Sequence, residues 1–419
     1  METDDVSVRE QLFHNRVRET IICVLLFTCL YMVSYLILTH FKKTAEFITD
    51  DVEDATVNKI ALWMCTFTLS VAVCAVLLLP ISILSNEVLL TFPQSYYMQW
   101  LNGSLIHGLW NLVFLFSNLS LVFLMPFAYF FTESEGFAGS KKGVMARVYE
   151  AVVLLLLLAL LVLGIVWVAS ALLHDNIARK SLYDLWEYYL PYLYSGISLF
   201  GVLLFLLCTP FGLSRMFSVT GSLLVKPRVS HRPTVVCVLM VCFNVLELLL
   251  DETAMPRGME DPHLGMASFS MFGSLGAAVQ VVLILYLMVS SVVGFYSSPL
   301  FMGLLPRAQD TNLTEIIANC VSLLILSSAL PVFSRTLGIT RFDLLGDFGR
   351  YNWLGNFYIV FLYNMLFAGL TSASLIKTVT WAVQRELIRA FGLHRLPLTV
   401  SRSTVPFRLL LASGLSKIQ

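Results

Sequence analysis

Charged side chains are scarce in this sequence. They make up 13% of the 419 residues, and hydrophobic residues make up 58%, whereas a soluble domain carries about 25% charged residues. The composition therefore predicts an integral membrane protein. The formal net charge of +0 also gives no electrostatic reason to expect a nucleic-acid partner.

The sequence also lacks the cysteine patterns of disulfide frameworks and metal sites. No Cys-x-x-Cys pair occurs, and all eight cysteines fall inside apolar runs, where they are typical of small packing residues. We expect no metal site and no cofactor. The cysteines are Cys23, Cys29, Cys65, Cys74, Cys208, Cys237, Cys242 and Cys320.

Long apolar runs are what the sequence does have. A helix needs about 20 mostly apolar residues to cross a bilayer; eight runs meet or approach that length, and a ninth, 234–250, is short. We predict an all-α, polytopic fold, a single membrane domain over 1–397 followed by a cytosolic tail at 398–419. The nine predicted spans lie near 20–40, 60–84, 105–131, 151–173, 189–212, 234–250, 272–296, 316–334 and 353–376.

The distribution of lysine and arginine predicts how the spans are oriented. If the N-terminus is outside, the segments that face inside hold about two thirds of the 27 basic residues. Basic residues are enriched in cytoplasmic loops. We therefore predict an N-terminus outside and a C-terminus inside.

The triplet Asp347-Phe348-Gly349 matches the magnesium-binding motif of protein kinases, but its context does not. The chain has no Gly-rich loop, no strand lysine and no His-Arg-Asp loop upstream, and segment 335–352 faces outside on the predicted topology. We predict that the protein is not an enzyme.

Two interpretations of the outer segment 335–356 stay open. Its alternating charges and its aromatic residues favour either a capping loop braced by Arg–Asp pairs or a platform that faces a ligand. The candidate residues are Arg341, Asp343, Asp347, Arg350 and Trp353.

The third predicted span carries polar residues at helical spacing. His107, Asn111 and Asn118, with Ser104, fall on one helical face. We interpret this intramembrane polar face as helix packing through hydrogen bonds; a ligand or proton path is the alternative.

The segment after the last span, from Lys377 to Leu396, has apolar residues near one helical face and basic residues on other sides. It predicts either a helix that lies on the inner leaflet or a continuation of the last span.

Several long stretches closely resemble the limb region 1 (LMBR1-like) family of membrane proteins, and within it the branch of lipocalin-interacting membrane receptors. They include "LNGSLIHGLWNLVFLFSNLSL", "MPFAYFFTESEGFAG", "YLMVSSVVGFYSSPLF" and "SSALPVFSRTLGITRFDLLGDFGRYNWLGNFYIVF". The resemblance implies a nine-span plasma-membrane receptor that binds lipocalin-type protein ligands, internalises them by endocytosis and has a role in signalling. Near 228–233 the family's long cytosolic, coiled-coil-like segment is missing.

Two other functions remain open. One is a transporter or transport accessory for a small hydrophobic molecule or a cobalamin-like cargo, in an endoplasmic-reticulum or lysosomal membrane. The other is a scaffold that controls the trafficking or signalling of other membrane proteins.

Overall fold

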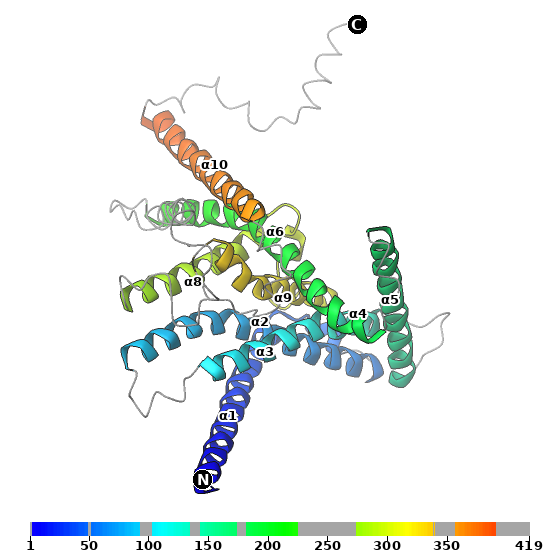
Figure 1. Cartoon of the computed structure of the whole chain (residues 1–419). Coiled ribbons are helices and arrows are strands. Elements are labelled where there is room, and N and C mark those ends of the chain that lie inside the picture. Colours follow the sequence, from blue (N-terminus) through cyan, green and yellow to red (C-terminus); the bar gives the residue numbers. More distant parts are fainter. Residues whose placement is uncertain are drawn as a thin grey trace.

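In the computed structural model the chain forms a bundle of long helices, and the bundle contains no strand among the described residues (Figure 1). The structure describes residues 2–48, 52–92, 103–134, 143–173, 182–224, 274–337, 339 and 357–390. The helices are α1 (Glu2–Phe41), α2 (Val52–Thr91), α3 (Gly103–Leu119), α4 (Met125–Glu133), α5 (Val144–Leu173), α6 (Leu182–Leu224), α8 (Ser274–Ser297), α9 (Leu313–Thr336) and α10 (Phe357–Ala390), with short helical turns η1 (Thr44–Phe47), η2 (Ser120–Leu124) and η5 (Met302–Leu304).

Within the described ranges, eight helical stretches are long and apolar enough to cross a membrane. They coincide with eight of the predicted spans, so the all-helical, multi-span prediction is confirmed. The predicted span 234–250 lies outside the described residues, and the total of nine stays a prediction. The stretches are Arg16–Phe41, Val52–Leu89, Leu105–Glu133, Val144–Ile165, Gly196–Met216, Leu275–Ser297, Leu313–Thr336 and Tyr358–Thr380.

Proline shapes the third span. Pro126 has no backbone N–H, so it cannot donate to the carbonyl four residues earlier. Just before it, η2 forms a π-helical turn in which the Met125 N–H bonds to the carbonyl of Ser120. This turn joins α3 and α4 into one continuous span from Leu105 to Glu133.

The tightest helix contact lies between α6 and α8, where two glycines meet. A Cβ atom added to Gly212 would lie 1.7 Å from the carbonyl oxygen of Ser290, and one added to Gly294 would lie 1.8 Å from that of Cys208. Small residues allow such close approach of helix backbones in membranes. The Thr209 and Ser291 hydroxyls, 2.8 Å apart, join the same two helices by a hydrogen bond.

Aromatic side chains connect α6 to α9 and α9 to α10. The Phe205 and Phe333 rings stack with centroids 4.4 Å apart, and Phe333 meets Phe367 edge-on at 5.8 Å. All three side chains are fully buried. These three helices share the largest buried core with α2, α3 and α8.

The end of α1 is tied to the segment before α9. The Lys43 N–H bonds to the Thr311 carbonyl over 3.1 Å, and the Glu46 carboxylate accepts a hydrogen bond of 3.1 Å from the Leu313 N–H. The side chain of Asn58, in the second turn of α2, donates to the Glu46 carbonyl over 2.8 Å. We call this end of the bundle the junction.

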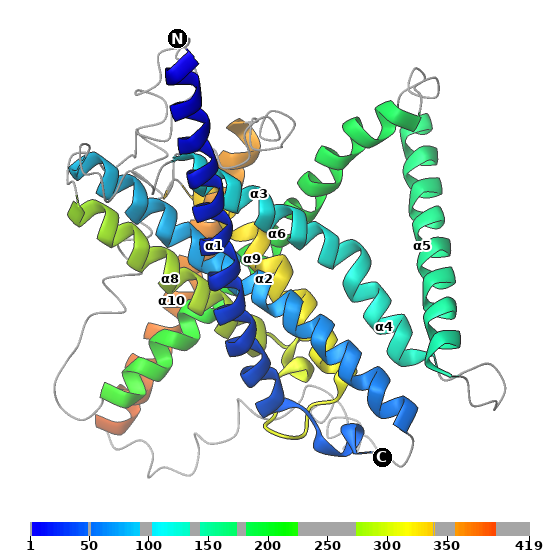
Figure 2. The same ribbon diagram turned by 90° about the horizontal axis from the view of Figure 1, so that it is seen from below.

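At the junction α5 also meets α2, through an ion pair between Arg147 and Asp54. Ala151 is buried there against Val57 and Phe131. Beyond this contact α5 stands apart from the bundle (Figure 2), and only 6% of its span Val144–Ile165 is buried.

The last helix runs without a break from Phe357 to Ala390. For the described part of the segment after the last span, up to Ala390, the helix continues without a break, which agrees with the second of the two predicted alternatives. The Tyr363 hydroxyl donates to the Val202 carbonyl over 3.0 Å, and Ser214 and Thr378 bond at 2.6 Å. α10 therefore runs alongside α6 in the same direction.

Candidate functional site

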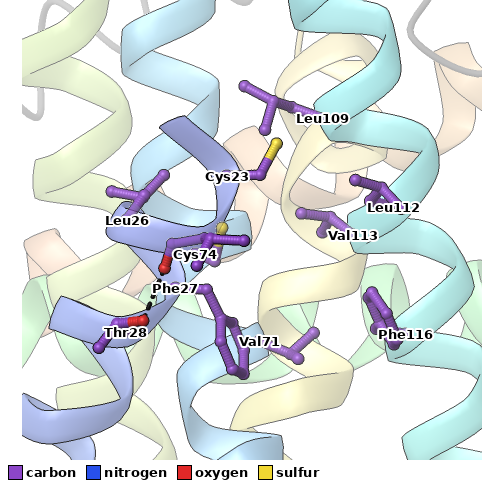
Figure 3. Close-up of a pocket in the computed structure, with 11 residues that line it drawn as sticks. Cys23, Leu26, Phe27, Thr28, Val71, Cys74, Leu109, Leu112, Val113 and Phe116 are labelled. Atoms are coloured by element: carbon purple, nitrogen blue, oxygen red, sulfur yellow. Dashed lines mark hydrogen bonds between the residues drawn. The ribbon is translucent and has the colours of Figure 1, made fainter. Parts of the chain in front are cut away.

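An apolar groove lies between α1, α2 and α3, and we call it the α1–α2–α3 groove (Figure 3). Its cavity volume is about 250 Å³. In the close-up Cys23 and Leu109 lie at one end, and Phe27 and Phe116 lie towards the other. The lining residues are Cys23, Val24, Leu26, Phe27 and Thr28 from α1, Val71 and Cys74 from α2, and Leu109, Leu112, Val113 and Phe116 from α3.

A row of aromatic rings sets the spacing of the three helices at one end of the groove. Phe67 of α2 meets Phe27 of α1 at 5.5 Å and Phe116 of α3 at 5.7 Å between ring centroids. Beyond these rings α1 and α2 present the smaller side chains of Cys23 and Cys74. The change from large to small side chains leaves the space that forms the groove.

A buried hydrogen bond fixes α3 on α2. The indole N–H of Trp110 donates to the Ser82 hydroxyl over 2.9 Å, and the Trp110 side chain is fully buried. The ring also stacks on Phe114 with a centroid distance of 5.4 Å. Because Trp110 precedes the groove residues Leu112 and Val113, this anchor holds the α3 wall in place.

The lining offers apolar surface and almost no hydrogen-bonding capacity. The Thr28 hydroxyl already donates to the Val24 carbonyl over 2.7 Å, and Cys23 and Cys74 carry free thiols. No lining residue is charged. Such a groove can bind an apolar group by removing it from contact with water and by packing against it; its lining residues include no acid, base or activated nucleophile.

The predicted intramembrane polar face on α3 lies away from the groove. Helical spacing places His107, Asn111 and Asn118 on the side of α3 opposite Leu112 and Phe116. Asn111 is exposed, and His107 and Asn118 are half-buried. None of the three makes a side-chain hydrogen bond to another described residue, so the choice between packing and a path stays open.

The predicted outer-loop residues lie outside the described part of the chain. They are Arg341, Asp343, Asp347, Arg350 and Trp353. Their role as loop-bracing or ligand-facing residues stays a prediction.

Sequence reasoning missed the groove because its residues carry no chemical signal. Leucine, valine and phenylalanine in an apolar run are expected in any membrane span. The groove arises only when three segments, 23–28, 71–74 and 109–116, come together. The nearest available hint was the small side chains of Cys23 and Cys74 within otherwise bulky runs.

The described residues define an all-helical, multi-span membrane protein with an apolar groove between α1, α2 and α3. The model of the LMBR1-like membrane protein family matches residues 19–232 and 222–379, and the chain belongs to this family. The two matched stretches meet at 222–232; the predicted loss of a cytosolic segment nearby stays a prediction.

Curated relatives match the chain over almost its whole length. Limb region 1 homolog-like protein of Danio rerio is 75% identical, and the alignment covers 100% of each chain. Protein LMBR1L of Homo sapiens is 62% identical over 94% of this chain and 96% of its own. Limb region 1 protein homolog of Homo sapiens is 54% identical over 94% and 95%. No solved structure matches the chain.

Proposed function

We propose that this chain is a plasma-membrane receptor for lipocalin-type carrier proteins, and that the α1–α2–α3 groove receives the small apolar molecule that the carrier brings. The observation that carries the proposal is the groove itself, with about 250 Å³ of space and a lining without charge. Membership in the LMBR1-like family and the resemblance to its lipocalin-interacting branch support the choice of partner.

The groove lies where it could receive an apolar molecule from a carrier docked on the outer side of the membrane. It begins at Cys23, seven residues after Arg16, which corresponds to about 10 Å along a helix that rises 1.5 Å per residue. On the predicted topology this depth is the outer half of the bilayer. An apolar molecule leaving a docked carrier would then move from one apolar site to another with little contact with water, which would be costly.

The proposal is tested with the full-length chain in lipid nanodiscs. We expect saturable binding of a purified lipocalin at the outer face, and transfer of a fluorescent apolar probe from the carrier to the receptor. Leu112→Trp places a larger side chain at the groove wall; it should preserve carrier binding and reduce probe transfer.

The matched control is Leu115→Trp, because Leu115 is exposed on the same helix and does not line the groove. Equal transfer by the wild-type protein and Leu112→Trp would contradict a role for the groove. Absence of lipocalin binding would contradict the receptor assignment itself.

A transporter or transport accessory is the second candidate, and the groove favours it only for a small apolar cargo. A cobalamin-like molecule is large and polar, and the groove offers it neither volume nor hydrogen bonds. Uptake into sealed vesicles separates the two functions: a transporter moves the probe to the lumen, whereas a receptor only retains it.

A further inference from the structure

Two charged side chains of opposite sign stand on α1 above the groove. Arg16 and Glu19 precede Cys23 by seven and four residues, so helical spacing places both on the groove side of α1. Arg16 is exposed and Glu19 is half-buried. No ion pair joins them to each other in the described part of the chain.

The cavity volume limits what the groove itself can hold. About 250 Å³ corresponds to roughly eight molecules of the size of water at ~30 Å³ each. This space holds part of one hydrocarbon chain and has no room for two chains side by side. A ligand with one chain therefore suits the groove best.

The order of the charges along α1 defines the head group. Starting from the groove, a bound molecule meets first the carboxylate of Glu19 and then, one helical turn further out, the guanidinium of Arg16. Carboxylates pair with ammonium groups, and arginine binds phosphate through two parallel hydrogen bonds. A complementary head group carries its amine next to the chain and its phosphate beyond the amine.

We propose that the α1–α2–α3 groove binds a single-chain amino-phosphate of the sphingoid-base phosphate class, with the chain in the groove, the ammonium group at Glu19 and the phosphate at Arg16. The inference rests on the proposed function only in taking the groove as the ligand site. It adds the chemical class of the cargo and two residues that select it.

The test measures binding of radiolabelled sphingosine 1-phosphate to the full-length chain in phosphatidylcholine nanodiscs, with empty nanodiscs as the blank. We expect saturable binding that Arg16→Gln and Glu19→Gln each weaken by about 1.5-fold to five-fold, the range found for exposed charge pairs. Relative to ligand dissolved in water, shortening the chain should weaken binding by about four-fold per methylene removed from the groove.

Arg18→Gln is the matched control, because Arg18 is exposed on the opposite side of α1; it should leave binding unchanged. Two ligands that each lack one of the charged groups test Glu19 and Arg16 separately. Sphingosine, which lacks the phosphate, should respond to Glu19→Gln alone. Lysophosphatidic acid, which lacks the amine, should respond to Arg16→Gln and bind more tightly to Glu19→Gln.

Lysophosphatidylcholine provides the decisive comparison, since it carries the same two charges in the reverse order. Binding of this ligand as tight as that of sphingosine 1-phosphate, with both variants unaffected, would overturn the assigned head group while leaving the groove as a site for single chains. If no single-chain ligand binds saturably, or if Leu112→Trp does not reduce binding, the proposed ligand class is wrong, and the receptor assignment is then decided by lipocalin binding alone. Lipocalin docking is measured separately, so failure of the carrier partnership is distinguishable from either result.

Discussion

At the junction, the carboxylate of Glu46 connects the segment after α1 to the start of α9. It accepts a hydrogen bond of 3.1 Å from the N–H of Leu313, in the first turn of α9. The first N–H groups of a helix have no partner within it, and a carboxylate there also interacts favourably with the helix dipole. Glu46 thus caps a helix that lies far away in the sequence.

We therefore expect Glu46→Ala to destabilise the protein by about 0.5–2 kcal/mol, the cost of losing an N-cap. The midpoint of thermal unfolding in detergent should fall. The control is Glu87→Ala, in the last turn of α2, whose side chain makes no hydrogen bond to a described residue. Equal shifts for the two variants would rule out the cap as the cause.

Trp110 and Asn111 are neighbours on α3 with opposite expected responses to mutation. Trp110→Phe removes the hydrogen bond to the Ser82 hydroxyl, and a hydrogen bond contributes about 0.5–1.5 kcal/mol. Asn111 is exposed on a membrane-spanning helix, where an amide is costly. Folded yield should fall for Trp110→Phe and stay equal or rise for Asn111→Leu. A lower yield for Asn111→Leu would instead indicate that a bound partner satisfies the amide.

Among the helices, the crossing of α6 and α8 is the contact most sensitive to added volume. An alanine methyl at Gly212 or Gly294 would lie within 2 Å of a backbone carbonyl oxygen, and backbone cannot yield as a side chain can. We expect each Gly→Ala variant to destabilise the protein by about 1–3 kcal/mol or more. Size-exclusion profiles and thermal unfolding provide the measurement.

Gly164 is the matched control for this crossing, because nothing lies within 4 Å of a Cβ atom added there. Gly164→Ala on α5 should be neutral or slightly stabilising, since alanine favours a helix more than glycine does. A loss of stability for Gly164→Ala as large as that for Gly212→Ala would show that the effect is not specific to the α6–α8 crossing.

Sequence patterns predicted the helices well and their contacts poorly. Each described span is a long apolar run, which composition alone reveals. Which residues of a run are buried depends on partner helices: Trp110 and Ser82, or Gly212 and Gly294, are far apart in sequence and give no joint signal. The same limit explains why the groove was missed while the polar residues of α3, conspicuous in an apolar run, were selected.

For the molecule as a whole, the directions of the helices follow from the junction. α1, α4 and α8 end there, and α2, α5 and α9 begin there, as the contacts of Lys43, Asp54 and Leu313 show. α5 leads away from the junction, so α6 starts at the opposite end of the bundle, which we call the far end. α6 then runs back towards the junction, and its Gly212 packs against Gly294 near the end of α8. The chain thus leaves α6 at the junction end and enters α8 at the far end (Figure 2).

The same reasoning separates the two ends of the chain. α10 runs in the direction of α6, so it finishes towards the junction, whereas α1 begins at the far end. Among the basic residues whose side chains the structure describes, most lie near the junction, and Arg16, Arg18 and Arg335 lie towards the far end. The junction group consists of Lys42, Lys43, Lys59, Arg147, Arg215, Arg307 and Lys377.

Basic residues favour the cytoplasmic side, so we expect the junction to face the cytosol, the N-terminus to lie outside and the C-terminus inside. An epitope tag at the N-terminus should stain on intact cells. A tag at the C-terminus should stain only after permeabilisation, together with a cytosolic marker that confirms intact membranes beforehand. If both tags stain on intact cells, the chain crosses the membrane an even number of times. The directions inferred for α6, α8 and α10 would then be inconsistent with a bundle in which every long helix spans the bilayer. If only the C-terminal tag stains, the direction of each helix relative to the others stands, and the assignment of the junction to the cytosol is wrong.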